Sequence, residues 1–574
     1  MSPASNSIVA NGHTNDTNGV SAHPKNWIPI AEHVLGKPQR KLRVISIGCG
    51  FSGLTLAHKI QNVFKIDDIV DLVLYEKNPD VGGTWFENRY PGVMCDVPAH
   101  IYTLLDLPDP DWPAFYATGQ DIQNYLVKIK KQHNLDREVV YDSRVIEAIW
   151  IEGEGKWHVK VEQKGSTIIQ DTCDVLINGS GVLNAWSWPK ILGLRDFKGH
   201  LSHSADWKSW QNAVDMTGMR VGVVGNGSSG MQIVPEVTKV ASQCFNFVRE
   251  GTWISAPFVE ELSKAPGTNP EYTQEEKDEF RRNPAKLKEH RHTLAQAFNH
   301  FYEALIKGSA ANKSAMEATK AMMADRLKAK PEMLEKLVPK WDLGCRRLTP
   351  GHGYLEAVTK DNFELVVGDI ARVTPKGVMM TNGKEYELDA LICATGFDVS
   401  FKPRWLQVGR QGQNLAKVWE DDAQGYFSLC VSGQPNYFIF NGPAGPVGHG
   451  SLSSAIDWEA NYIIKWLQKM AREDIKSFDV KKSVQDDWNV WGDELLKRTV
   501  WSSGCRSWYK SGTRDGRITA LYPGSILHFK DMVEDIRGED FDITYTSKNQ
   551  WKFLGDGFTQ LEVDNGDLGY YIEC

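Results

Sequence analysis

Arg43-Val-Ile-Ser-Ile-Gly48-Cys-Gly-Phe-Ser-Gly53 is the stretch of sequence that decides the fold. A short apolar run leads into three glycines with Gly-x-Gly-x-x-Gly spacing, and a helix-like segment, 54–60, follows. A second apolar run, 71–75, ends at Glu76, which stands 23 positions after Gly53. This order is typical of a dinucleotide site, because the glycines admit a pyrophosphate at a helix N-terminus and the acid receives ribose hydroxyls.

The same order of elements recurs later in the chain. A strand-like run, 220–224, leads into Gly225-Asn-Gly-Ser-Ser-Gly230, and the next run, 244–248, ends at Arg249, 19 positions after Gly230. A carboxylate repels a 2′-phosphate, whereas a guanidinium binds it bidentately. The acid at Glu76 therefore assigns FAD to the first unit, and Arg249 assigns NADPH to the second. The adjacent Glu250 leaves the use of NADH open.

Length and composition exclude several classes of protein. The 574 residues predict two or three domains, and 41% hydrophobic with 24% charged residues is ordinary for globular proteins. A net charge of −8 argues against a nucleic-acid partner. Nine cysteines without a Cys-x-x-Cys pair argue against a redox dithiol or a zinc site, and their odd, unpaired number favours a reducing compartment. We expect a cytoplasmic protein, since no apolar run could span a membrane and no signal peptide precedes the domains.

The predicted fold class is α/β, with two Rossmann-like dinucleotide-binding domains. Residues 1–25 form a tail that we expect to be disordered, and 40–190 form the first part of the FAD domain. The NADP domain covers 191–385 and contains a helical insertion, 273–340, which opens with a capping box, Thr273-x-x-Glu276, and shapes the substrate entrance. Residues 386–574 return to the FAD domain, starting with a strand that ends in Ala394-Thr-Gly396, and add a C-terminal extension.

Three further motifs carry a resemblance to a known family. Phe197-x-Gly-x-x-x-His203-x-x-x-Trp207 lies between the two units, and Gly82-Gly-Thr-Trp85 and Cys95-Asp96 follow the first glycine turn. With the two glycine turns, these motifs resemble the Baeyer–Villiger monooxygenases, in the form found in fungal secondary metabolism. The resemblance extends from Arg43 to the C-terminus. Met94 departs from it, since the family usually has Arg there, and so does Lys208, where the family continues with Pro or Asp.

The resemblance implies a role for individual residues. Arg347 matches the catalytic arginine over the flavin, and Asp96 is expected to hold it. Arg346 matches the position that meets the 2′-phosphate. Trp508 matches a C-terminal loop that folds over the nicotinamide cofactor, although a core aromatic is an alternative reading.

The glycine loop 441–450 is expected to face the flavin through the N-terminus of the helix that it opens. The fingerprint residues are Phe197, Gly199, His203 and Trp207, among which His203 is expected to serve in a hinge between the halves and not in proton transfer. The residues expected to bind FAD are Gly48, Gly50, Phe51, Ser52, Gly53, Glu76, Gly83, Thr84, Trp85, Asp96, Val97 and Tyr102. The residues expected to bind NADP are Gly225, Asn226, Gly227, Ser228, Ser229, Gly230, Arg249, Glu250, Arg346 and Trp508.

The implied activity is the insertion of one oxygen atom from O2 beside a ketone carbonyl, giving an ester or lactone. FAD and NADPH are the implied cofactors, and the implied substrate is a lipophilic secondary metabolite. Two alternatives stay open: a related flavin monooxygenase that hydroxylates nitrogen or oxidises sulfur, and a flavoprotein that has lost oxygenation. No metal site is expected, and the sequence leaves the oligomeric state open.

Overall fold

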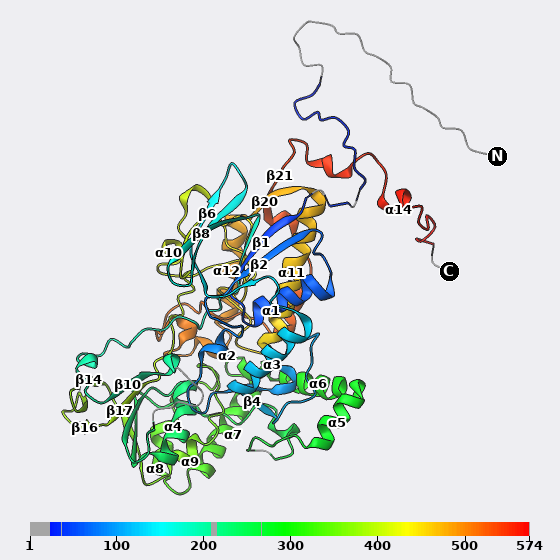
Figure 1. Ribbon diagram of the computed structural model, residues 1–574. Helices are drawn as coiled ribbons and strands as arrows, with labels where there is room; N and C mark the ends of the chain where they lie inside the picture. Colours follow the sequence, from blue (N-terminus) through cyan, green and yellow to red (C-terminus); the bar gives the residue numbers. More distant parts are fainter. Residues whose placement is uncertain (1–22, 36, 39, 208–214, 266, 573–574) are drawn as a thin grey trace, which may run out of the picture.

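The computed structural model describes residues 23–35, 37–38, 40–207, 215–265 and 267–572. Figure 1 shows a body of two α/β units, from which the described residues before β1 (Leu42–Ile47) and after β21 (Phe541–Tyr545) project together. The predicted tail and Lys208 lie outside the described residues, apart from residues 23–25. The longest described helix, α11 (Leu452–Glu473), carries charges of both signs, and no described helix is long and apolar enough to cross a membrane.

The first unit is built on a five-stranded parallel sheet with the order β19-β9-β1-β2-β5. Its central strand β1 is buried on both faces, as its unbroken apolar run requires. Helix α1 (Phe51–His58) starts at the first glycine turn and packs against α11. The strands are β1 (Leu42–Ile47), β2 (Val70–Tyr75), β5 (Val139–Val140), β9 (Val175–Asn178) and β19 (Tyr437–Ile439).

The second unit repeats this plan with the order β10-β17-β11-β12-β13, again with all strands parallel. Helix α4 (Ser228–Val240) starts at the second glycine turn and packs against α9 (Tyr354–Val358). The strands are β10 (His200–His203), β11 (Arg220–Val224), β12 (Gln243–Val248), β13 (Phe363–Val367) and β17 (Ala390–Cys393). The predicted pair of Rossmann-like domains is confirmed.

Two details of the predicted organisation are wrong. Strand β17 belongs to the second sheet, between β10 and β11, so the chain returns to the first unit after residue 393 and not at 386. The returning strand is β19, a short apolar run that sequence reasoning missed. The fingerprint stretch is also not a free linker, because its residues His200–His203 form the edge strand β10 and pair with β17.

The predicted helical insertion is confirmed. Its helices are α5 (Gln274–Arg282), α6 (Pro284–Asn299), α7 (Ala310–Arg326) and α8 (Glu332–Leu337), with a 3-10 segment, His300–Leu305, after α6. The Thr273–Glu276 capping box is present at the start of α5, since each side chain bonds the other residue's backbone N–H. In Figure 1 these green helices lie beside and below the second unit.

Smaller sheets surround the two units. A four-stranded sheet has the order β18-β6-β7-β8 and a three-stranded sheet the order β14-β15-β16, while β3 pairs with β4 and β20 with β21. Their strands are β3 (Met94–Pro98), β4 (Tyr116–Thr118), β6 (Ser143–Ile151), β7 (Lys156–Gln163), β8 (Thr167–Cys173), β14 (Ile370–Thr374), β15 (Gly377–Met380), β16 (Glu385–Glu387), β18 (Leu406–Val408), β20 (Ile475–Val480) and β21 (Phe541–Tyr545). The remaining α-helices are α2 (Thr84–Glu87), α3 (Gly119–His133), α10 (Leu415–Val418), α12 (Lys482–Leu496), α13 (Ile526–Met532) and α14 (Gln560–Val563).

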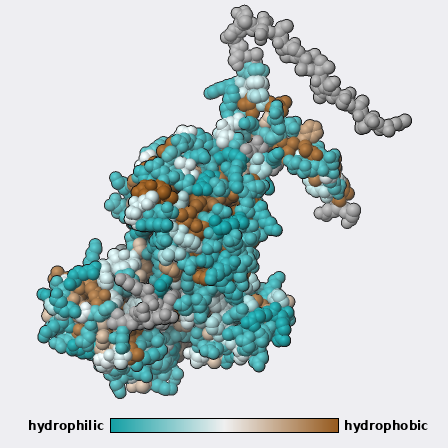
Figure 2. Space-filling model, viewed as in Figure 1, coloured by the Kyte–Doolittle hydropathy of each residue, from teal (hydrophilic) through white to brown (hydrophobic). Residues whose placement is uncertain are grey.

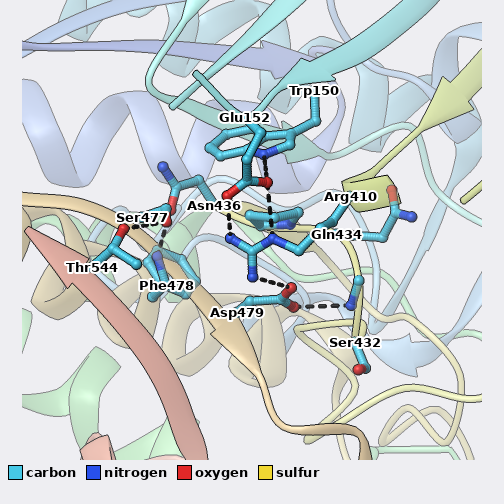
Figure 3. Close-up of polar contacts among 12 residues, drawn as sticks. Trp150, Glu152, Arg410, Ser432, Gln434, Asn436, Ser477, Phe478, Asp479 and Thr544 are labelled. Atoms are coloured by element: carbon cyan, nitrogen blue, oxygen red, sulfur yellow. Dashed lines mark hydrogen bonds and ion pairs between the residues drawn. The ribbon is translucent and has the colours of Figure 1, made fainter. Parts of the chain in front are cut away.

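A polar network ties the four-stranded sheet to the C-terminal part (Figure 3). Arg410 donates to Glu152 at 2.9 Å and to Asp479 at 3.0 Å, and Trp150 donates to Glu152 from the other side. Burial raises the pKa of Asp479 to about 6, although Arg410 acts in the opposite direction. The network joins segments that lie far apart in the sequence.

The two ends of the chain hold one another. Leu35 donates its N–H to the carbonyl of Phe558 at 2.8 Å, and Asp556 donates to His33 at 2.9 Å. The projecting C-terminal end carries exposed large side chains, among them Phe558, Tyr570 and Ile572. Figure 2 shows brown patches on this projecting part of the molecule.

Candidate active site

Both glycine turns have the geometry that a dinucleotide needs. At Gly53 a Cβ would lie 2.3 Å from the carbonyl oxygen of Gly48, and at Gly230 it would lie 2.3 Å from that of Gly225. Only glycine therefore lets each helix start so close to its strand. The helices α1 and α4 have the glycines Gly50 and Gly227 as N-caps and no acid in the first turn, so their first N–H groups are left for an anion.

The FAD residues predicted from the sequence gather around the first turn. A Cβ on Gly50 would lie 3.5 Å from the Cα of Gly83, which brings the second glycine motif against the first. Phe51 packs on Tyr102 at a ring distance of 5.0 Å, and Trp85 donates to the Tyr102 hydroxyl. Ser52, Thr84 and Val97 lie in the elements that carry these residues, α1, α2 and β3. Gly50 and Gly83 thus leave a space free of side chains, and the rings of Phe51, Trp85 and Tyr102 form an aromatic wall.

Glu76 is 3% exposed and accepts hydrogen bonds from two backbone N–H groups, those of Cys49 at 2.7 Å and Asn78 at 2.8 Å. Burial raises its pKa, while these two hydrogen bonds act in the opposite direction. The carboxylate thus stands directly beside the glycine turn, where a ribose would lie.

The corresponding end of the second unit is rich in arginine. Glu250 pairs with Arg346 and, at 3.2 Å, with Arg514. The pKa of Arg346 is lowered by burial, and the charges of Arg249, Arg514 and Arg506 lower it further, while Glu250 raises it. An open pocket of about 590 Å³ adjoins this group and is lined by Arg249, Glu250, Lys336, Lys340, Trp341 and Arg514, among others.

The other predicted NADP residues lie around the second turn. Asn226 donates to the carbonyl of Glu250 at 2.8 Å, and Ser228 shares a hydrogen bond with Thr349 at 2.9 Å. Ser229 lies beside Tyr90, a residue of the first unit. Trp508 is half-buried against Tyr509, at a ring distance of 4.6 Å. It lines neither the pocket beside Arg249 nor the cavity beside Arg347.

Asp96 and Arg347 meet where the two units face each other. Arg347 donates from Nη2 to both Asp96 oxygens, at 2.7 and 2.8 Å, so the predicted pair is confirmed. Asp96 raises the pKa of Arg347 above its usual range, although burial opposes this. The side chain of Arg347 is 38% exposed, and that surface faces a cavity. The guanidinium therefore stays charged, and Asp96 bonds it through Nη2 alone.

The cavity has a volume of about 450 Å³. Arg347 and Tyr509 contribute polar groups, and Gly448 and Gly450 of the predicted glycine loop line it as well. The helical insertion and the segment before it supply apolar and aromatic walls. That the insertion shapes a substrate entrance stays a prediction. Residues of these walls include Phe258, Phe298, Phe301, Leu305 and Ala315.

Sequence reasoning missed several residues of this region. Tyr509 is buried beside Arg347 and lines the cavity, although its neighbour Trp508 was the predicted aromatic. Arg514 carries no motif of its own, and no signal in the sequence could have placed it beside Glu250. Phe258, Phe298 and Phe301 were hidden in a segment with mixed apolar and charged residues.

The prediction of unpaired cysteines is wrong for two residues. Cys345 and Cys505 form a disulfide across 160 positions of sequence. The pair was invisible in the sequence because only the tertiary fold brings the arginine segment against the C-terminal loop. The other described cysteines are free and buried, so the cysteine pattern no longer argues for a reducing compartment as it did from the sequence.

His203 is buried and neutral. Burial lowers its pKa to about 4. Its Nδ1 accepts from Ala205 N–H at 3.1 Å, so the proton sits on Nε2, which lies 3.1 Å from the Thr395 hydroxyl. The ring stacks on Trp186 at 4.4 Å. Phe197 and Trp207 are buried, while a Cβ on Gly199 would meet the Asp389 carbonyl at 2.4 Å. These contacts fix β10 beside β17.

Comparison with known proteins agrees with this geometry. A model of the flavin-binding monooxygenase-like family matches residues 41–262. The FAD-binding monooxygenase tazF of Aspergillus terreus is 43% identical over 541 residues, which cover 94% of this chain and 95% of that protein. A Baeyer–Villiger monooxygenase of Pseudomonas aeruginosa is 29% identical, and the match covers 88% of this chain and 92% of that protein.

Among solved structures, that of OTEMO in complex with FAD and NADP superposes with a TM-score of 0.76. Its sequence is 23% identical, and the match covers 88% of this chain and 100% of that one. The chain belongs to the flavin-binding monooxygenases. The suspected resemblance to that group, the two-domain fold and the oxidoreductase class are confirmed.

Proposed function

We propose that the protein is an FAD-dependent, NADPH-consuming Baeyer–Villiger monooxygenase. It inserts one oxygen atom from O2 beside the carbonyl of a ketone and yields an ester or lactone. The observation that carries this proposal is the Asp96–Arg347 pair, whose arginine faces a largely apolar cavity lined by the helical insertion and the C-terminal part of the chain.

Arg347 supplies the charge that this chemistry needs. Oxygen insertion beside a carbonyl places negative charge on the oxygen of the former ketone, and a fixed cation lowers the free energy of that state. Asp96 binds the guanidinium through Nη2 only, so the other N–H groups of its fork remain available. A guanidinium suits this role better than an ammonium because it stays protonated and its donors have fixed directions.

The first unit fits FAD and the second fits NADPH. FAD, when bound, supplies the reduced flavin that activates O2. The uncapped N-terminus of α1 would face its pyrophosphate, and Glu76 would bind its ribose. In the second unit Glu250 pairs with Arg346 and Arg514, and Arg249, Lys336 and Lys340 line the adjoining pocket, so positive charge is in excess where a 2′-phosphate would bind. The surplus of positive charge favours NADPH over NADH.

The cavity favours a lipophilic substrate. Its volume of about 450 Å³ and its aromatic walls suit a ketone larger than a simple ring, with the carbonyl directed at Arg347. This choice agrees with the predicted secondary metabolite. A cytoplasmic location stays a prediction.

The test is a product assay with FAD-loaded protein, NADPH, O2 and a panel of cyclic, polycyclic and aryl ketones. We expect a product heavier than its ketone by one oxygen atom, formed in proportion to the NADPH consumed. The Arg347→Ala variant serves as the control that retains cofactor reduction.

Organic sulfides and primary amines belong in the same panel. Oxygenated sulfide or amine with every ketone left unchanged would replace the proposal by the related monooxygenase. NADPH oxidation that yields only hydrogen peroxide with all three substrate classes would favour a flavoprotein without oxygenation.

A further inference from the structure

The arginine segment 342–347 runs alongside the C-terminal loop 503–509 and contacts it at four successive points. The Ser503 hydroxyl donates to Asp342, and Arg346 Nε donates to the carbonyl of Arg506 at 2.8 Å. Arg347 lies beside Tyr509, and the two side chains line the same cavity. The fourth contact is covalent, since Cys345 and Cys505 form a disulfide directly beside both arginines.

The C-terminal loop is a compact unit. Lys510 Nζ lies in its interior and donates to the carbonyls of Ser503 and Arg514, both at 2.7 Å. Gly512 N–H closes a turn onto Ser507 at 2.9 Å, and Arg514 reaches back to the Gly504 carbonyl at 3.1 Å. A restraint on Cys505 therefore also restrains Arg514, which pairs with Glu250.

Electrostatics opposes this closed arrangement. The loop brings Arg506 and Arg514 toward Arg346 and Arg249, and the neighbouring positive charges lower the pKa of Arg346. Glu250 offsets part of this repulsion. Without a bound dianion, the like charges favour an open loop, because they surround Arg346, whose side chain is only 21% exposed and is partly deprived of water. A covalent bond resists that opening, whereas single hydrogen bonds contribute about 1 kcal/mol each.

We propose that the Cys345–Cys505 disulfide is a positioning element of the active site. It holds the loop 503–514 closed against the arginine segment, so that Arg346, Arg347 and Arg514 are in place before the nicotinamide dinucleotide binds. The proposal rests on the proposed NADPH site. It adds a covalent determinant of cofactor affinity, formed by two residues that touch neither cofactor nor substrate.

Formation of the bond needs a two-electron oxidant, and a peroxide is sufficient. One thiolate attacks H2O2 to give a sulfenic acid and hydroxide, and the second thiol then displaces a second hydroxide, so that two thiols and one H2O2 give one disulfide and two waters. Both sulfurs are buried, which shields the finished bond from thiols as large as glutathione.

The first measurement is the thiol count of the denatured, FAD-loaded protein with and without prior reduction. We expect reduction to reveal two additional thiols. An equal count in both samples, after exposure of the protein to H2O2, would overturn the proposal.

The second measurement is the affinity for NADP+ by titration calorimetry, in the variants Cys345→Ser, Cys505→Ser and the double variant. The matched control is Cys430→Ser, which alters a buried, free cysteine. If the unlinked loop is closed about a tenth of the time, each variant binds NADP+ about tenfold more weakly. The double variant should lose no more than either single variant, because one bond is lost in all three.

Flavin content and the rate of flavin reduction at saturating NADPH should stay near those of the wild type, which separates lost closure from lost folding. NADP+ affinity equal to the wild type, or losses that add in the double variant, would refute the positioning role. If the serine variants do not fold, reduced and oxidised wild type give the same comparison. Failure of the proposed function would be seen in the product assay instead. In that case protein with the intact disulfide forms no oxygenated ketone.

Discussion

The two dinucleotide units share one plan and differ at the end of their second strand. In the first, Glu76 is 3% exposed and bonded to the glycine turn of its own unit. In the second, the side chain of Glu250 is 30% exposed and is held by Arg346 and by Arg514, whose side chain is 54% exposed. Both partners come from distant segments of the chain.

The difference indicates two kinds of cofactor site. A buried acid with backbone partners suits a cofactor that stays within the fold, since nothing has to move around it. An exposed cluster of charges from three segments suits a cofactor that arrives and leaves, because long-range attraction guides a phosphate and a loop can close over it. Four predictions test this comparison.

The largest effect is expected where the two units meet. Arg347→Ala removes the cation that faces the cavity, and ketone oxygenation should fall on the order of 10²–10³-fold or more. Reduction of the flavin by NADPH should continue, since the glycine turns are untouched. Stopped-flow absorbance of the flavin, combined with product analysis, measures both. Undiminished product formation would remove Arg347 from the catalytic role.

The same substitution in both glycine turns sharpens the comparison. Gly53→Ala and Gly230→Ala each force a Cβ to within 2.3 Å of a backbone oxygen, and relief of that overlap costs about 1–3 kcal/mol. Gly53→Ala should lower the FAD content of the purified protein. Gly230→Ala should keep FAD and weaken NADP+ binding roughly tenfold to a hundredfold. A loss of FAD in both variants would show that the halves are not independent.

Arg249 and Glu250 test the choice of nicotinamide cofactor. Arg249→Ala should raise the KM for NADPH about tenfold by removing one charge-assisted hydrogen bond, and it should leave the KM for NADH nearly unchanged. Glu250→Gln should lower the KM for NADPH, because Arg346 and Arg514 lose their competing carboxylate. Steady-state rates with both cofactors give the ratio. Equal effects on the two cofactors would place the 2′-phosphate elsewhere.

The smallest effect concerns acid stability of the second unit. Burial lowers the pKa of folded His203 to about 4, below the ordinary value of 6.5, so the fold favours the neutral ring. The resulting stability is present above pH 6.5 and is lost as the pH falls toward 4. His203→Asn keeps an acceptor near Nδ1 but does not titrate.

Relative to that variant, the wild type should lose about 1 kcal/mol of unfolding free energy between pH 7.5 and 5.5. Denaturant titrations at the two pH values measure the difference. If the wild type and the variant differ by the same unfolding free energy at both pH values, protonation of His203 does not destabilise the fold. Full coupled turnover by His203→Asn would separately refute a hinge role for this residue.

Much of the fold could be predicted because its signals are local. An apolar run followed by Gly48-x-Gly-x-x-Gly53 predicts a strand, a turn and a helix within a dozen residues, and the structure contains all three. The capping box at Thr273 likewise needs only neighbouring residues. The Asp96–Arg347 pair was predictable only through the family resemblance, since 251 positions separate the two residues.

Other features depend on long-range contacts that no local pattern records. Strand β17 has the composition of any buried strand, so only its pairing with β10 and β11 shows to which sheet it belongs. The rings of Trp508 and Tyr509 pack on each other from adjacent positions, and Tyr509, not Trp508, lines the cavity that Arg347 faces.

The sequence by itself determined the two Rossmann-like units, their order and the contrast between Glu76 and Arg249, because spacing within one strand, turn and helix fixes backbone geometry. The tertiary structure alone decided how that contrast is expressed. It paired Arg346 and Arg514 with Glu250 and joined Cys345 to Cys505 in a disulfide. It also enclosed the cavity that Arg347 faces. Such contacts join segments more than 90 positions apart, and they follow from the packing of whole domains, which no short stretch of sequence contains.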